Sequence, residues 1–237
     1  GRVKDICDHH RKHKSEYKGF KFYPCMPYAH KYANAVTEHG MVGAVRQFVP
    51  SEGLVNTMLR GGASLARQDI EGISKILVDA EMKMFDGLNT PVIFLQNVVV
   101  DLILGLGMHS AFKVFREHVR EKYQAEAGFI TMNFPLLLKA LADEGVRNPV
   151  ICTNFNKLGF RMSGGLEAYR EALDNYEVRT IAMSVFASGA IPPDEAIDWI
   201  AKQDGVESIV FGASSQKNIR QTAELVHRHF GRCSVSR

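Results

Sequence analysis

The chain has 237 residues, of which 46% are hydrophobic, and its formal net charge is +3 at pH 7. This length and composition are sufficient for one well-packed core, and they suit a single α/β barrel or a doubly wound domain. Because 26 acidic residues are interleaved with the 29 basic ones, the charge argues against a nucleic-acid-binding protein.

The early and middle parts of the chain mix helical and strand patterns. Residues 2–14, 30–38, 64–85, 110–124 and 135–143 are predicted to be helices, and residues 20–25, 92–96 and 129–132 are predicted to be strands. Residues 42–49 fit either a helix or a strand. In the helix over residues 64–85, one apolar face is expected, formed by Ile70, Ile73, Leu77, Ala80 and Met84.

The longest apolar run, residues 91–106, contains Gln96, Asn97 and Asp101. It is too short and too polar to cross a membrane, and we interpret it as a buried strand followed by a buried helix. The four cysteines form no CxxC pair, which is typical of a reduced, cytoplasmic protein. No signal peptide is visible, so we expect a cytoplasmic location and no membrane partner.

The last third of the chain repeats one pattern three times. Strands are predicted at residues 150–153, 180–185 and 208–211, and each is followed by a helix, at residues 166–173, 193–202 and 216–229. This alternation predicts a parallel α/β fold. We expect one domain over residues 1–237, a (βα)8 TIM-type barrel that lacks its first strand in this sequence. An open doubly wound sheet is the alternative.

Polar side chains follow the predicted strands, and in a parallel barrel all strand ends meet at one rim. Neutral amides and hydroxyls dominate there, and such groups orient a polar ligand by hydrogen bonds. Asn154, Asn156 and Ser184 are therefore candidate cofactor-binding residues. The alternative for each is an ordinary residue that ends a strand or caps a helix.

The turn Gly212-Ala213-Ser214-Ser215 precedes the last predicted helix. Gly212 allows close approach of a ligand, Ser214 or Ser215 can cap the helix, and the free N–H groups of a first helical turn favour an anion. Lys217 and Arg220 add positive charge where the helix dipole does not favour it. Gly212, Ser214, Ser215 and Arg220 are thus candidates to bind a phosphorylated small molecule, unless the turn is a simple cap beside surface charges.

Two motifs occur in a fixed order near the end of the chain. Thr153-Asn154-Phe155-Asn156 comes first, and a helix containing Trp199, a strand and the Gly-Ala-Ser-Ser turn follow. This order resembles aldo-keto reductases, which have an S-N-F-N strand end and a G-A-S-S or K-S turn. The resemblance implies an oxidoreductase with NADP or NAD, whose adenosine phosphate would lie at the turn and whose nicotinamide would lie near Asn154. The Asp, Tyr, Lys and His of that family's catalytic set have no matching positions here, so a lyase or isomerase and a non-catalytic binding barrel remain alternatives.

Three residues are candidates for catalysis. Tyr28 and His30 lie close together after the first predicted strand, and a histidine can transfer protons near neutral pH, although both residues also suit the start of a helix. Lys157 could form a Schiff base if it were desolvated. His9 and His13 share a helix face, but the missing Glu of an H-E-x-x-H motif and the surrounding basic residues argue against a metal site.

Asp101 stands in an otherwise apolar segment, and a buried charge is costly unless it is paired. Its position fits either a residue on a helix face at the rim or a buried site residue. The oligomeric state is open as well, and a homo-oligomer is compatible with the sequence.

Overall fold

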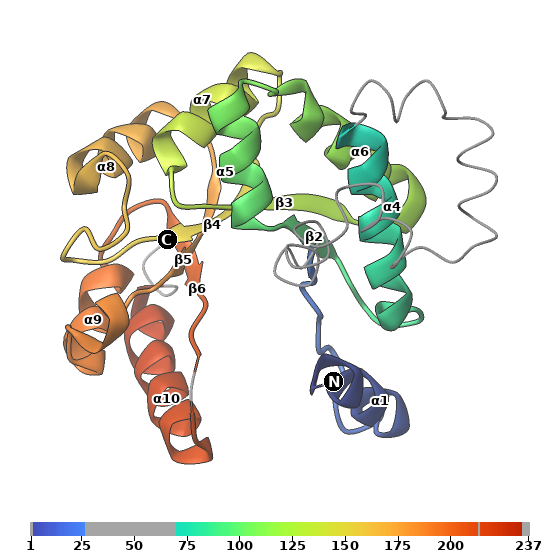
Figure 1. The fold of residues 1–237 in the computed structure, drawn as a ribbon. Coiled ribbons are helices and arrows are strands. Elements are labelled where there is room, and N and C mark those ends of the chain that lie inside the picture. The colour runs from blue at the N-terminus through green and yellow to red at the C-terminus, as the bar shows by residue number, and fades with distance from the viewer. Residues whose placement is uncertain (1, 27–69, 213, 234–237) are drawn as a thin grey trace, which may run out of the picture. The chain divides into compact units, whose positions relative to one another are not determined.

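The computed structural model describes residues 2–26, 70–212 and 214–233 (Figure 1). The predicted helix at residues 30–38, the ambiguous segment at residues 42–49, Tyr28 and His30 all lie outside these ranges. The chain divides into two compact units, residues 1–99 with 110–128 and residues 100–109 with 129–237, which we describe separately. The expectation of a single domain stays a prediction.

The first unit contains α1 (Arg2–Lys12), β1 (Cys25–Met26), α4 (Ile70–Met82), a 3-10 turn (Lys83–Phe85), β2 (Val92–Leu95) and α6 (Ser110–Tyr123). All four residues of β2 are buried, as expected for a parallel strand that is covered on both faces. The ring of Phe94 packs on Gly128, where a Cβ atom would lie 2.5 Å from Phe94 Cε1. A glycine is therefore required at this point of the first unit.

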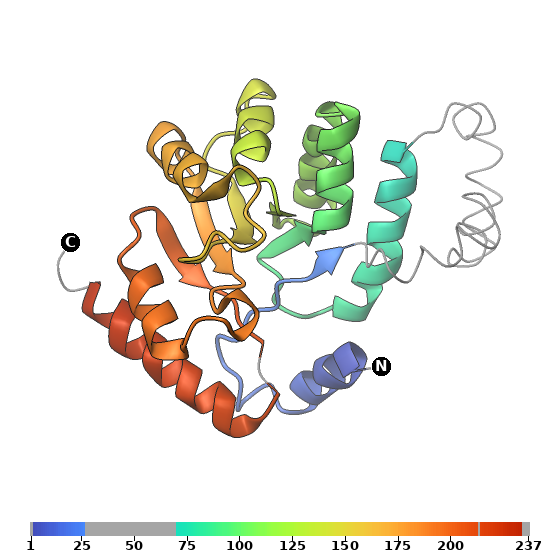
Figure 2. The same ribbon diagram turned by 60° about the vertical axis from the view of Figure 1, so that its left-hand side comes forward.

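The second unit holds most of the strand–helix repeats. Its elements are α7 (Phe134–Asp143), β4 (Val150–Asn154), α8 (Gly165–Asn175), β5 (Arg179–Met183), a 3-10 turn (Ala187–Gly189), α9 (Pro193–Ala201), β6 (Val206–Ile209) and α10 (Gln216–Cys233). Two elements cross the unit boundary, α5 (Asn97–Leu106) and β3 (Glu126–Thr131). Within the second unit α9 and α10 lie side by side in both views (Figures 1 and 2).

The strands form one parallel sheet in the order β1-β2-β3-β4-β5-β6, so each strand pairs with the next strand of the chain. The prediction of a parallel α/β sheet alternating with helices is confirmed. A doubly wound sheet needs a point at which the strand order reverses. No such reversal occurs among the described strands.

Two strands differ in extent from their predictions. The strand expected at residues 20–25 is limited to Cys25–Met26. Phe20 and Tyr23 remain half exposed, and Pro24 has no N–H group to donate to a ladder. The strand expected at residues 208–211 begins at Val206, directly after Gly205 in a left-handed conformation, and ends at Ile209.

In two helices, the burial of apolar side chains differs from what the sequence predicts. Where α4 and its 3-10 turn are described, Val78, Met82 and Phe85 are buried, whereas Met84 from the predicted face is 37% exposed. The helix α5 buries Val100, Ile103 and Leu104, while another row of its apolar side chains is exposed: Val98, Leu102 and Leu106. None of the described helices combines the length and the apolar character that a membrane span requires.

Candidate functional site

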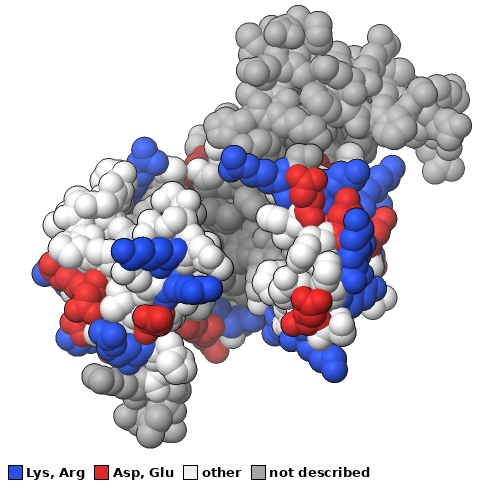
Figure 3. Space-filling view, turned by 90° about the horizontal axis from the view of Figure 1, so that it is seen from below, with Lys and Arg blue, Asp and Glu red and all other residues white. Residues whose placement is uncertain are grey.

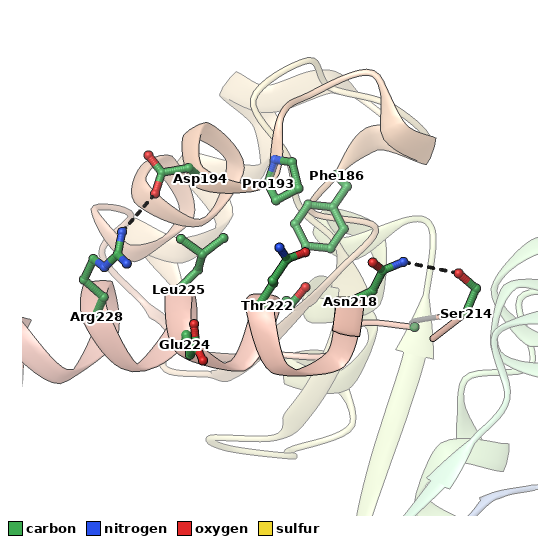
Figure 4. A pocket seen from close by; sticks show the side chains of 11 residues that line it. Phe186, Pro193, Asp194, Ser214, Asn218, Thr222, Glu224, Leu225 and Arg228 are labelled. Atoms are coloured by element: carbon green, nitrogen blue, oxygen red, sulfur yellow. Dashed lines mark hydrogen bonds and ion pairs between the residues drawn. The ribbon is translucent and has the colours of Figure 1, made fainter. Parts of the chain in front are cut away.

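A cleft of about 620 Å³ lies between α9 and α10 in the second unit (Figure 4). Phe186 from the segment after β5 and Pro193 and Asp194 from the first turn of α9 form one side. Gly212 and Ser214 precede α10, and the helix itself contributes the other wall, with Asn218, Thr222, Leu225 and Arg228 among its lining residues. The cleft therefore begins at the N-terminus of α10 and follows the helix.

The first turn of α10 is capped as the sequence predicts. The Asn218 N–H donates to Ser215 Oγ at 3.2 Å, and the Asn218 side-chain amide donates to Ser214 Oγ at 3.3 Å. The backbone N–H groups of Gln216 and Lys217 make no hydrogen bond with any described residue. The positive end of the helix dipole thus lies beside the cleft.

Thr222 is a lining residue that sequence reasoning missed. Only 7% of its surface is exposed, and it lines the larger cleft. Helical periodicity could have identified it, because Asn218, Thr222 and Leu225 follow Ser215 at three- and four-residue steps and share one face. The same geometry turns Lys217 and Arg220 away, so Arg220, a predicted ligand contact, is exposed and does not line the cleft.

A second cleft, of about 350 Å³, adjoins the first and shares Phe186 and Gly212 with it. Its walls come from the ends of β4, β5 and β6, and they include Phe160, Arg161 and the predicted Ser184. A Cβ atom at Gly212 would meet nothing within 4 Å, so the space beside this glycine is open. The carboxyl ends of three neighbouring strands thus build one pair of clefts, as expected for a parallel α/β protein.

The backbone around the smaller cleft is strained. Arg161, Ser184 and Ser188 line it with φ angles of 55°, 55° and 60°, in the left-handed region that side chains with a Cβ disfavour. Such conformations cost on the order of 1 kcal/mol each, and they concentrate at ligand-binding and active sites.

Asn154 and Asn156 are fully buried, and neither lines the two clefts. The Asn154 side-chain amide donates to the carbonyl of Arg161 at 2.9 Å. Asn156 donates to the carbonyl of Phe160 at 2.9 Å and accepts the N–H of the same residue at 2.9 Å. Both residues therefore hold the loop that brings Phe160 and Arg161 to the smaller cleft, with the Arg161 guanidinium 5.3 Å from the centre of the Phe160 ring.

Lys157 lies in the same loop but outside both clefts. Its Nζ is 2.7 Å from Glu195 Oε1, and the two side chains are 47% and 49% exposed. A Schiff-base lysine needs a desolvated amine, which a half-exposed, ion-paired ammonium does not provide.

Asp101 is partly buried and holds the turn after β3. Its carboxylate accepts the Thr131 hydroxyl at 2.5 Å and the Met132 N–H at 3.2 Å. The Tyr169 hydroxyl donates to the Met132 carbonyl at 2.9 Å, and the Thr153 hydroxyl donates to the Thr131 carbonyl at 3.1 Å. Burial raises the pKa of Asp101, and the two hydrogen bonds oppose that rise. Asp101 therefore lies on α5, partly buried, and stabilises the turn after β3.

His9 contacts both His13 and Tyr17. The two rings stack with 4.4 Å between their centroids, and His9 Nε2 lies 3.0 Å from the Tyr17 hydroxyl. Within residues 2–26, 70–212 and 214–233, no group of three or more His, Cys, Asp and Glu residues could hold a metal ion.

Acidic and basic side chains alternate over the described residues on the face seen in Figure 3, and no broad patch of one charge forms there. Protein-family models, curated proteins and solved structures were compared with the chain, and none of them matches it.

Proposed function

We propose that this protein binds a phosphorylated small molecule in the two adjoining clefts, with a phosphate group at the first turn of α10. The observation that carries the proposal is the opening of the larger cleft at this turn, beside Ser214 and two N–H groups that bind none of the residues the structure describes. A helix N-terminus in this arrangement attracts an anion through both its N–H groups and its dipole.

Thr222 supports the same proposal. Its side chain is mostly buried and lines the larger cleft. An oxygen or hydroxyl of a ligand in the cleft would form a hydrogen bond with its hydroxyl group. The candidate ligand is a nicotinamide nucleotide, NADP or NAD, because the motif order of residues 153–156 and 212–215 resembles that of aldo-keto reductases. The corresponding reaction would be an oxidation or reduction of a small substrate.

We further propose that the sheet belongs to a (βα)8 barrel. The sequential strand order supports this architecture, and so does the position of both clefts at the carboxyl ends of β4, β5 and β6. The ion pair of Lys157 with Glu195 weighs against a Schiff-base lyase as the alternative.

Titration with NADPH and with NADH tests the proposal, with the fluorescence of the single tryptophan, Trp199, as the readout. Trp199 lies on α9, whose first turn lines the larger cleft, and its ring contacts Phe155 edge-on. We expect saturable quenching by at least one nucleotide. Absence of binding of both at millimolar concentration would reject the nucleotide proposal.

Two substitutions on α10 locate the ligand. Thr222→Val preserves the side-chain shape and removes the hydroxyl, and we expect it to weaken binding by about tenfold, which corresponds to one hydrogen bond. Arg220→Gln is the matched control on the opposite face of the same helix, and we expect it to leave the affinity within about twofold at fixed ionic strength. Equal effects of the two substitutions would place the ligand elsewhere.

A further inference from the structure

We propose that the smaller cleft binds a small apolar carboxylate, with the Arg161 guanidinium as the partner of its carboxyl group. The inference deepens the proposed function, because it names the class of substrate that would lie beside the phosphorylated ligand. It rests on that function only for the link between the two molecules. The carboxylate site itself depends only on the residues that build the smaller cleft.

Arg161 is the charged residue in the lining of the smaller cleft, and no acidic side chain from the described part of the chain lines it. The guanidinium lies 5.3 Å from the centre of the Phe160 ring, and no carboxylate among the described residues pairs with it. The larger cleft differs, because Asp194 and Glu224 line it together with Arg228. The smaller cleft therefore carries an uncompensated positive charge, which favours an anion. Arg161 is exposed, so an incoming anion can reach it.

The backbone that carries this guanidinium is fixed by two buried amides. The Asn154 side chain, 1% exposed, donates to the Arg161 carbonyl at 2.9 Å. The Asn156 side chain binds both the N–H and the carbonyl of Phe160, the residue before Arg161. Arg161 also has a φ angle of 55°, a conformation that persists where the surrounding structure imposes it. The cation thus extends from a fixed backbone, which reduces the entropy lost when an anion binds.

The other walls of the smaller cleft favour an organic carboxylate over an inorganic anion. The apolar side chains that line the cleft are Phe160, Val185, Phe186, Val210 and Phe211. A volume of about 350 Å³ is at the lower end of the range for small-molecule sites, so the cleft suits a single substituted ring. The two oxygens of a carboxylate match the planar fork of a guanidinium, and an apolar body covers walls that inorganic phosphate would leave bare.

The position of the smaller cleft makes its occupant a neighbour of the proposed phosphorylated ligand. The two clefts adjoin at Phe186 and Gly212, which line both of them. A molecule in the smaller cleft therefore lies beside a ligand whose phosphate binds at the first turn of α10. A reaction between a cofactor and a substrate requires such simultaneous binding. The substrate class that follows is a small apolar or aromatic carboxylic acid, oriented by Arg161.

Calorimetric titration of the full chain with benzoate tests the site, and benzamide is an uncharged analogue of nearly the same shape. At neutral pH and fixed ionic strength, we expect benzoate to bind at millimolar or lower concentration, and benzamide to bind more weakly. Arg161→Gln should weaken benzoate binding by about tenfold, as expected for loss of a charge-assisted pair, and should leave benzamide binding within about twofold. Arg161→Lys keeps the charge without the planar fork, and should give an intermediate loss.

Arg147→Gln is the matched control, because Arg147 is exposed, lines neither cleft and has no ion pair among the described residues. It should leave both affinities unchanged. Equal loss of benzoate binding in Arg147→Gln and Arg161→Gln would reduce the effect to net charge and overturn the site. Equal loss of benzoate and benzamide binding in Arg161→Gln would overturn it too, as would the absence of benzoate binding to the wild type at millimolar concentration.

Titration with NADPH separates this inference from the proposed function. Benzoate binding that depends on Arg161, without any binding of NADPH, would support the carboxylate site and count against the nucleotide. NADPH binding without benzoate binding would do the reverse. Where both molecules bind, they should occupy the protein together, and mutual exclusion would overturn the assignment of the carboxylate as a substrate.

Discussion

Asn156 is completely buried at the end of β4, and both atoms of its amide bind a single residue, Phe160. Replacement by alanine leaves the N–H and C=O of Phe160 without these partners. We expect Asn156→Ala to reduce the free energy of unfolding by about 2 kcal/mol. Urea unfolding measures this loss, and hydrogen exchange at Phe160 should accelerate as the loop opens. Asn175→Ala, an exposed asparagine at the end of α8, should change neither measurement.

Asn156→Ala also tests whether Asn156 contacts the ligand or only positions the loop that lines the cleft. Because Asn156 does not line a cleft, its loss should act on ligand binding only through the displaced Phe160 and Arg161. The sequence marks Asn154 and Asn156 as unusual, since two amides at a strand end suit a binding site. It does not predict that both amides bind their own loop, because that depends on the path of residues 157–163. The distinction between a ligand contact and a loop support is therefore a three-dimensional one.

The helices α4 and α6 are joined by one carboxylate. Asp79 on α4 lies 2.8 Å from His118 Nε2, 2.6 Å from Lys122 Nζ and 2.5 Å from the Tyr123 hydroxyl. Burial alone would raise the pKa of Asp79, but the hydrogen bonds outweigh burial and lower the pKa below its ordinary value of 3.8. The carboxylate contact therefore stabilises the fold above that pH, and the stabilisation is lost as pH falls through the lowered pKa.

We expect Asp79→Asn to destabilise the protein at neutral pH by on the order of 1–2 kcal/mol, because three donors lose a charged acceptor. The difference from the wild type should shrink as pH falls below 3.8 and through the lowered pKa of Asp79, where the wild-type carboxylate becomes protonated as well. Asp143→Asn serves as the comparison, since its pair with Lys139 is more than half exposed and should contribute little. A difference that stays constant until the protein unfolds in acid would contradict this account.

At the scale of elements, hydrophobic periodicity predicted the positions of the helices more accurately than it predicted which face of each helix is buried. The helices predicted at residues 110–124, 135–143, 193–202 and 216–229 are confirmed with small changes at their ends. The face of α10 that lines the cleft was not predicted. The positive charges of Lys217 and Arg220 favoured an anion site on the face that the structure shows to be exposed. β1 was predicted too long because Phe20 and Tyr23 are strand formers that remain on the surface. Such errors arise where tertiary packing, and not local preference, decides the outcome.

At the scale of the whole molecule, the sequential strand order supports the proposed barrel, and closure at β6 is the feature that separates a barrel from an open sheet. β6 is the last strand of the described sheet, and the Val210 N–H binds the Ala182 carbonyl of β5 at 2.9 Å. In a parallel ladder the neighbouring N–H, that of Ile209, points to the opposite side of β6. In an open sheet this group faces solvent, whereas in a closed barrel it binds a further strand.

Hydrogen exchange at these two adjacent amides therefore tests barrel closure without knowledge of the partner strand. In a chain that supplies the first strand of the proposed (βα)8 barrel, we expect slow exchange at both Ile209 and Val210, because a closed barrel has no free strand edge. Val210 is the internal control, since its bond to β5 exists in either architecture. Fast exchange at Ile209 beside slow exchange at Val210 would show an open edge at β6. In that case the clefts at the ends of β4, β5 and β6 would remain, but the residues opposite them could not be those of a continuous barrel rim.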